Sequence, residues 1–336
     1  MKTVLRNVIV SALSILLLPG ASYEDRQPSA PEPLLLVIEQ PDKETEPSPQ
    51  PEQTVVRLLV GQETRELPLE EYLVGVVLSE IPAGFSLEAF KAQAVAARTF
   101  ALRRLAEPKH ADCDLCADAA CCQAWTSPEA LREKFGADYE STRKKGADAV
   151  RDTAGEALYY DGTLIDAVYY SCSGGKTEDA LAVWGSEVPY LQSVPSPGEQ
   201  DAPRNFAEVC MEADELAAKL REARPDCDFS ASPECWFEKS ERTRGGGVAS
   251  AVIGGQTFTG TELRRLLGLN STDFTVCVSD GSVTFSTRGF GHRVGMSQYG
   301  AEAMAKQGFD YRTILRYYYR GTEIKKLPGE DSGENG

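Results

Sequence analysis

Three side chains in this 336-residue sequence stand where they could do chemistry. Glu80 interrupts an apolar segment, His110 opens the pattern His110-x5-Cys116-x5-Cys122, and His292 ends the run RGFGH. The chain has only these two histidines, and both stand among cysteines or glycines. We therefore expect the histidines to serve chemistry rather than packing.

The segment from Leu69 predicts a helix that carries Glu80 on its apolar face. Four residues follow the spacing of one helix face: Leu69, Leu73, Val76 and Glu80. Glu80 would lie in the last turn, at the negative end of the helix dipole. Burial and the dipole both disfavour a carboxylate, so a raised pKa and a role as general acid are expected. The spacing equally allows a glutamate that turns to solvent or pairs with Lys91 or Arg98.

The loop that begins at His110 predicts a metal site. Imidazole and thiolate ligands at short spacing suit tetrahedral Zn²⁺, and three of them leave a fourth position for water, another cysteine or a substrate group. Disulfides are the alternative in an exported chain, and Cys227 and Cys235 are spaced like a loop staple. A metal is favoured in the first loop because it includes a histidine and because adjacent Cys121 and Cys122 would bridge each other poorly.

Charge and composition restrict the compartment and the partners. The formal net charge of −16 argues against nucleic acid, which requires clustered Lys and Arg. Residues 1–21 have a basic start and an apolar stretch shorter than the roughly 20 residues of a membrane span, which predicts a signal peptide or, if retained, a membrane anchor. Residues 22–53 predict a disordered Pro/Glu-rich tether and 328–336 a disordered tail. The body of the protein is then extracytoplasmic, tethered to the membrane, or secreted after cleavage.

Residues 54–327 predict one folded domain of the α+β class, with mixed helices and short antiparallel sheets around a substrate groove. Helices are expected from 67 and from 86 to 105, and near 127–135, 139–150, 212–223, 261–267, 297–307 and 311–318. Strands are expected at 54–60 and 167–170, and hairpins at 157–165 and 274–287.

Two glycine-rich turns lie in the second half of the chain, SCSGGKT from Ser171 and GFGHRVGMSQYGA from Gly289. Neither has the spacing of a phosphate-binding loop. With Trp184, Tyr190 and Tyr299 nearby in sequence, they would suit a groove that holds sugar rings. Ordinary tight turns are the alternative, and these residues alone favour it.

Together these segments resemble the stage II sporulation protein D family, which includes the amidase-enhancer proteins of bacterial cell walls. The matching motifs are LPLEEYLxGVVxxExP from Leu67, EAxKAQAVAART from Glu88, SxSGG from Ser171, WG at Trp184 with PYL at Pro189, and GHxVGMSQYGA from Gly291. They are specific and span nearly all of residues 54–327. The family usually has glycine where this chain has Arg293, which could alter the shape or charge of the groove.

The resemblance implies a lytic transglycosylase that cuts the MurNAc–GlcNAc bond of peptidoglycan, preferably on strands without stem peptides, during sporulation and engulfment. It implies Glu80 as the catalytic acid and His110, Cys116 and Cys122 as zinc ligands. In the matching motifs we expect the following substrate-binding residues: Lys91, Gln93, Arg98, Ser173, Gly174, Gly175, Tyr190, His292, Ser297, Gln298 and Tyr299.

A single carboxylic acid suffices for this reaction because no water takes part. Glu80 would protonate the bridging oxygen and then accept the proton of the sugar's own 6-hydroxyl, which leaves a 1,6-anhydro end. The zinc would then be structural, near the active site. The resemblance also implies a cell-wall amidase and a membrane scaffold of the engulfment machinery as partners, and it allows a homodimer. A non-catalytic glycan binder that stimulates an amidase, and a zinc hydrolase, are the competing hypotheses.

Overall fold

The computed structural model describes residues 54–327. The expected export segment 1–21, tether 22–53 and tail 328–336 lie outside these residues, so they stay predictions. Within 54–327, no helix combines the length and the apolar character that a bilayer crossing requires.

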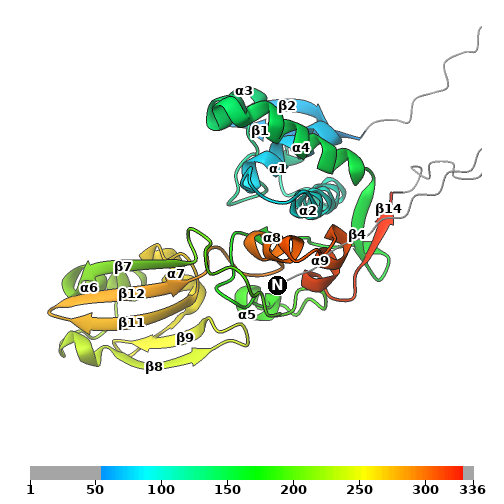
Figure 1. The fold of residues 1–336 in the computed structure, drawn as a ribbon. Helices are drawn as coiled ribbons and strands as arrows, with labels where there is room; N and C mark the ends of the chain where they lie inside the picture. The colour runs from blue at the N-terminus through cyan, green and yellow to red at the C-terminus, as the bar shows by residue number, and fades with distance from the viewer. Residues whose placement is uncertain (1–53, 328–336) are drawn as a thin grey trace, which may run out of the picture. The chain divides into compact units, whose positions relative to one another are not determined.

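Helices and short sheets alternate along the described residues, which confirms the α+β class (Figure 1). The helices are α1 (Leu69–Glu80), α2 (Leu87–Ala106), α3 (Pro128–Phe135), α4 (Tyr139–Asp152), α5 (Ala180–Trp184), α6 (Ala213–Ala223), α7 (Gly260–Leu267), α8 (Gln298–Lys306) and α9 (Tyr311–Tyr318). Single 3₁₀ turns occur at Gly136–Asp138 and Pro233–Cys235.

The strands form three-stranded and two-stranded sheets, mostly antiparallel. One group surrounds the helices: β1 (Val55–Val60), β2 (Glu63–Pro68), β3 (Leu115–Cys116), β4 (Glu156–Tyr160), β5 (Thr163–Leu164), β6 (Tyr169–Tyr170), β13 (Met296–Ser297) and β14 (Glu323–Lys326). Their orders are β2-β1-β3, β14-β4-β5 and β13-β6. The predicted strand at 167–170 is reduced to the short β6, which pairs in parallel with β13.

The Ala-rich helix α2 lies at the centre of the helical part and packs against α1, α4, α8 and α9. Its alanines from Ala89 to Ala101 are buried, and such small side chains allow neighbouring helices to approach closely. The predicted single apolar stripe of α1 is too narrow, because Tyr72, Val77 and Leu78 on its other sides are buried as well. Since α1 is enclosed on most sides, its last residue, Glu80, has a fixed backbone position.

Residues 206–288 have a hydrophobic core of their own. Two antiparallel sheets, β7-β12-β11 and β10-β9-β8, enclose it with α6 and α7 (Figure 1). The strands are β7 (Phe206–Glu212), β8 (Phe237–Arg242), β9 (Val248–Ile253), β10 (Gln256–Thr259), β11 (Asp273–Ser279) and β12 (Ser282–Arg288). The hairpin β11–β12 is as predicted. The sheet of β8 to β10 escaped prediction because β8, with the sequence FEKSER, is polar and almost wholly exposed.

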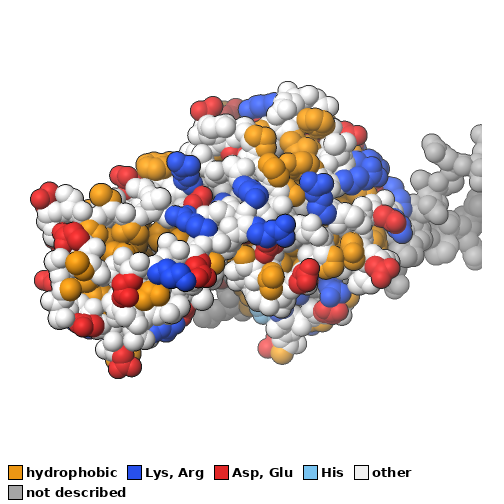
Figure 2. Space-filling view, turned by 90° about the horizontal axis from the view of Figure 1, so that it is seen from below, with side chains coloured by type: hydrophobic (Ala, Val, Ile, Leu, Met, Phe, Trp, Pro, Cys, Tyr) orange, Lys and Arg blue, Asp and Glu red, His pale blue; other side chains and the backbone are white. Residues whose placement is uncertain are grey.

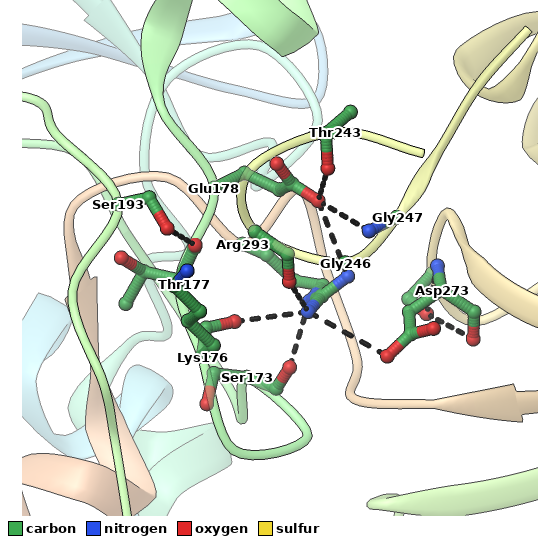
Figure 3. A network of polar contacts seen from close by, with 12 residues as sticks. Ser173, Lys176, Thr177, Glu178, Ser193, Thr243, Gly246, Gly247, Asp273 and Arg293 are labelled. Atoms are coloured by element: carbon green, nitrogen blue, oxygen red, sulfur yellow. Dashed lines mark hydrogen bonds and ion pairs between the residues drawn. The ribbon is translucent and has the colours of Figure 1, made fainter. Parts of the chain in front are cut away.

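Arg293 connects this region to the rest of the protein (Figure 3). Its guanidinium donates to three backbone carbonyls: Ser173 (2.7 Å), Lys176 (2.9 Å) and Gly245 (3.0 Å). It also lies 3.5 Å from Glu178 Oε1. Arg293 is fully buried and does not line the large cavity beside Glu80 that is described below. Arg293 can therefore affect that cavity through the position of region 206–288 and not by placing its charge in it.

Arg293 has a positive φ of 66°, a conformation that costs a non-glycine residue about 1–2 kcal/mol. The contacts of the guanidinium offset this cost. Glu178, which is completely buried, accepts further hydrogen bonds from the Thr243 hydroxyl (2.7 Å) and the Gly247 amide (2.9 Å). A Cβ on Gly245 would lie 2.4 Å from a Glu178 oxygen, so the loop closes on this carboxylate only with glycine there.

We predict that Arg293→Gly destabilises the protein although it relieves the backbone. Glycine regains about 1–2 kcal/mol of strain, but the buried Glu178 loses its cation, which costs about 3–5 kcal/mol. The free energy of unfolding from urea titration should therefore fall by a few kcal/mol. The double variant Arg293→Gly with Glu178→Gln should recover part of the loss, and a single Arg293→Gly variant as stable as wild type would contradict this account.

Candidate active site and metal cluster

A cavity of about 1170 Å³ opens beside the C-terminal end of α1. Its lining comes from the end of α1, the second half of the cysteine loop, β6, the glycine-rich turn before α8, and the end of α7. The volume exceeds the 300–1,000 Å³ typical of small-molecule sites, which fits an extended ligand. Glu80 is the single carboxylic acid among the described residues that line it.

Glu80 is held in place by two hydrogen bonds. One carboxylate oxygen accepts from the Ala124 amide at 3.0 Å and the other from Gln298 Nε2 at 3.2 Å. Burial is the main influence on this group and raises the pKa of Glu80, although the two donors and the nearby charge of Lys134 oppose the shift. The expected direction of the pKa is thus supported, with burial as its cause.

Lys134 changes the predicted role of the helix dipole. Its ammonium group donates to the carbonyls of Leu78 and Ser79, at 3.2 and 3.4 Å, in the last turn of α1. A cation at these carbonyls offsets the negative end of the helix. The raised pKa of Glu80 therefore rests on desolvation rather than on the dipole.

The alternative partners of Glu80 are occupied elsewhere. Lys91 pairs with Glu88 and Asp152, at 3.3 and 3.4 Å. Arg98 is fully buried, and its guanidinium lies 2.6 Å from Glu70 Oε2. Neither cation neutralises Glu80, and neither side chain lines the cavity.

Three of the predicted substrate-binding residues do line the cavity: His292, Gln298 and Tyr299. The other eight do not: Lys91, Gln93, Arg98, Ser173, Gly174, Gly175, Tyr190 and Ser297. Gln93 contacts a lining residue instead: its Oε1 accepts a hydrogen bond from Gln298 Nε2 at 3.4 Å. The structure gives Lys91 and Arg98 the ion pairs described above.

The remaining five positions have local structural contacts. The Ser173 hydroxyl donates to the buried Glu199 at 3.0 Å, and the Ser297 hydroxyl caps α8 by accepting from the Gly300 amide. The Tyr190 hydroxyl accepts from the Asp166 amide. Gly174 and Gly175 have positive φ, so the SGG turn satisfies a backbone requirement there.

His292 lines the cavity, but the backbone uses both nitrogens of its ring. Nε2 donates to the Tyr169 carbonyl at 3.0 Å, and Nδ1 accepts from the Val294 amide at 3.1 Å. Burial, with the charge of Arg264, lowers the pKa of His292 to about 4, so the ring is neutral at physiological pH. The expectation that this histidine serves chemistry is not supported by its contacts, which instead fix the glycine-rich turn against β6.

Gln123 and Tyr169 are among the cavity residues that the sequence did not single out. The Tyr169 hydroxyl donates to Gln123 Oε1 at 2.7 Å, and Gln123 Nε2 donates to the Tyr72 hydroxyl at 3.0 Å. This chain of bonds orients the segment that carries the Ala124 amide. Only the position of Gln123, directly after the cysteine pair, could have suggested its role.

The structure brings His110, Cys116 and Cys122 together and adds Cys121, with all four ligand atoms within 4.8 Å of one another. His110 Nε2 lies 3.4 Å from Cys122 Sγ and 3.6 Å from Cys121 Sγ, and the two sulfurs are 4.0 Å apart. A tetrahedral Zn²⁺ with bonds of about 2.0–2.3 Å separates its ligand atoms by roughly 3.5–3.8 Å. The cluster therefore has the donor set and the spacing of a zinc site.

The cysteines of the described residues are all unbridged. The predicted staple between Cys227 and Cys235 is wrong in this structure, because Cys227 is buried against the carbonyls of Leu220 and Ile253 while Cys235 is exposed. Cys113 is buried outside the four-residue cluster.

The fold and the site together define an α+β protein in which one buried carboxylic acid lies in a large cavity, beside a cluster of soft nitrogen and sulfur ligands. Residues 61–160 match the family model described as stage II sporulation protein. These residues include α1, α2 and the histidine–cysteine loop.

The chain is 42% identical over 269 residues to stage II sporulation protein D of Bacillus subtilis (strain 168), covering 79% of this chain and 77% of that protein. It is 40% identical over 265 residues to the protein of the same name from Bacillus amyloliquefaciens, covering 77% and 75%. An amidase enhancer of Bacillus subtilis (strain 168) is 31% identical over 305 residues, covering 75% of this chain and 40% of the relative. The chain belongs to the stage II sporulation protein D family.

We predict that Glu80→Gln stabilises the protein at neutral pH. The folded-state pKa of Glu80 is raised, so the folded protein holds this proton more tightly than the unfolded chain does. The contribution of Glu80 to stability is therefore greatest below its unfolded pKa and is lost as the pH rises through the folded pKa. Melting temperatures of the variant and wild type should differ most at neutral pH and converge in acid; a gap that widens in acid would contradict the raised pKa.

Proposed function

We propose that this protein is a lytic transglycosylase that cleaves the MurNAc–GlcNAc bond of peptidoglycan strands and leaves 1,6-anhydro-MurNAc ends. The observation that carries the proposal is that residues 54–327 place a single carboxylic acid, Glu80, in a cavity large enough for several sugar rings. A glycosidase that uses water generally needs two carboxyl groups, one as the acid and one as the base or nucleophile. One acid is sufficient when the substrate's own hydroxyl is the nucleophile.

In this reaction Glu80 first donates its proton to the bridging oxygen as the glycosidic bond breaks. The substrate's N-acetyl group supports the positive charge at the anomeric carbon, and Glu80 then accepts the proton of the 6-hydroxyl as that oxygen closes the ring. Burial raises the pKa of Glu80, which favours the protonated form that the first step requires. The Ala124 amide and Gln298 stabilise the carboxylate between the two steps, so the same group serves as acid and base.

We further propose that His110, Cys116, Cys121 and Cys122 hold Zn²⁺. Four protein ligands complete a tetrahedron, which is characteristic of structural zinc and disfavours the zinc-hydrolase hypothesis. The bound metal would cross-link a loop that has little hydrophobic core. Ala124, which donates to Glu80, follows Cys122 by two residues, so a fixed cluster positions the amide that holds the catalytic acid.

A second function is favoured by the relative named amidase enhancer. In that case the cavity would bind glycan without cleaving it, and the protein would stimulate a cell-wall amidase. On either hypothesis we propose peptidoglycan strands as the ligand and an extracytoplasmic location in sporulating cells, with an amidase and a membrane scaffold as partners.

We predict that Glu80→Gln abolishes cleavage of peptide-free glycan strands and preserves binding. The amide keeps the volume and one acceptor of the acid but carries no transferable proton. For the wild type, mass spectrometry should detect 1,6-anhydro ends, and the rate should fall as the pH rises through the raised pKa of Glu80. Wild-type protein that binds glycan and yields no anhydro product would select the amidase-stimulating function. Products with reducing ends would instead indicate hydrolysis.

We predict that Cys116→Ser and His110→Ala lower the zinc content and the melting temperature together. Loss of one of four ligands weakens a structural zinc site strongly, and metal binding contributes to folding free energy. Cys113→Ser is the matched control, because Cys113 is a neighbouring buried cysteine outside the cluster. One equivalent of zinc retained in either ligand variant would remove that residue from the site.

A further inference from the structure

Three arginines line the cavity that holds Glu80: Arg204, Arg264 and Arg265. Arg264 and Arg265 lie in the last turn of α7, and Arg204 precedes β7. All three therefore belong to region 206–288 or its immediate border, whereas Glu80 belongs to the helical part. The cavity thus has an acid from one part of the fold and, from another part, three arginines that we call the basic wall: Arg204, Arg264 and Arg265.

These arginines have no carboxylate partner among the described residues, although the chain has 51 acidic and 35 basic residues. Arg264 uses one nitrogen, Nε, to donate to the Asn270 carbonyl at 3.2 Å. Arg204 stacks its guanidinium on the Phe290 ring, 4.6 Å from the centroid, and Phe290 also lines the cavity. The forked ends of the side chains are thus left for other acceptors.

The basic wall is unusual in so acidic a protein. Figure 2 shows Lys and Arg side chains across the middle of one face, with Asp and Glu side chains among them and along its edges. Within the cavity the described residues include three arginines and one carboxylic acid, Glu80. An anionic ligand would therefore be repelled by much of the protein and attracted to this site.

We infer that Arg264 and Arg265, together with Arg204, form a subsite for carboxylate groups carried by the glycan. This inference rests on the proposed glycan substrate. Each MurNAc carries a lactyl group, which ends in a free carboxylate when the stem peptide has been removed and in an uncharged amide when it is present. Guanidinium groups match carboxylate geometry with paired donors, so the subsite distinguishes stripped strands from peptide-bearing ones.

The structural alternative is that Arg264 and Arg265 only stabilise the end of α7. Basic residues in a last turn offset the helix dipole, and Arg316 in the last turn of α9 is in the same position on another eight-residue helix. A purely stabilising role would lower the melting temperature and affect charged and uncharged glycans equally. A carboxylate subsite would affect charged glycans selectively.

The test measures binding by calorimetry to the full chain carrying Glu80→Gln, which prevents turnover. The ligands are three oligosaccharides of equal length: a peptide-free GlcNAc–MurNAc strand, the same strand with stem peptides, and a chitin oligosaccharide without carboxylates. The added variants are Arg265→Gln alone, Arg264→Gln with Arg265→Gln, and Arg316→Gln as the matched control. Each titration is repeated at low and high salt.

We expect the peptide-free strand to bind more tightly than chitin, with an advantage that shrinks in high salt. The double variant should weaken binding of the peptide-free strand about tenfold, as loss of charge-assisted hydrogen bonds does, without changing chitin binding. Arg316→Gln should change neither. Equal losses for chitin and the peptide-free strand would overturn the inference.

If the peptide-bearing strand bound as tightly as the stripped one, with the same dependence on these arginines, the assignment to the lactyl carboxylate would be overturned. Because the assay measures binding in a Glu80→Gln background, it is independent of catalysis. Wild-type protein without cleavage activity but with full arginine-dependent discrimination would refute the transglycosylase proposal and leave the subsite intact.

Discussion

The site depends on the burial of one carboxylic acid at the end of an enclosed helix. A glutamate there is tolerated because its two oxygens have donors, the Ala124 amide and Gln298. The donors come from the loop at Ala124 and from the first residue of α8. The end of α1, this loop and α8 are distant in sequence, and all three must meet before Glu80 is held by both hydrogen bonds. Each supports the others: desolvation raises the pKa of Glu80, and the donors keep its ionised form accessible.

The loop that supplies the Ala124 amide has little apolar sequence, so side-chain chemistry must organise it. The histidine and cysteine ligands converge at one end, and Gln123 links the loop to Tyr72 and Tyr169. A site of this kind is sensitive to loop position, since a displacement of an ångström would remove the donor from the acid. The Zn²⁺ proposed for this cluster would thus act on activity through the position of the loop and not through bond breaking.

The sequence predicted the helices around the site well, because their apolar periodicity and caps are local signals. Residue type and spacing also predicted that Glu80 is buried and that His110, Cys116 and Cys122 lie together, whereas their roles stay predictions. Prediction from sequence failed where side chains meet over long distances. Arg98 was expected to bind substrate but pairs with Glu70, and the motif positions Ser173 and Ser297 satisfy backbone and carboxylate groups instead. A sequence motif therefore does not tell whether a residue stabilises the fold or contacts a ligand.

Region 206–288 shows a second limit of prediction from sequence, since its exposed, polar strand β8 carries a weak signal and the region contains none of the family motifs. Its importance follows from placement alone: Arg293 anchors it through buried contacts, and its arginines reach the cavity of Glu80. On the proposed function, chemistry and selectivity come from different parts of the fold: Glu80 would cleave the glycan, and the three cavity arginines would hold it there. An anionic sugar chain that approaches a protein of net charge −16 would be attracted where the local charge is reversed. Arg293 would then contribute to selectivity without touching the ligand, because it positions the part of the fold that carries these arginines.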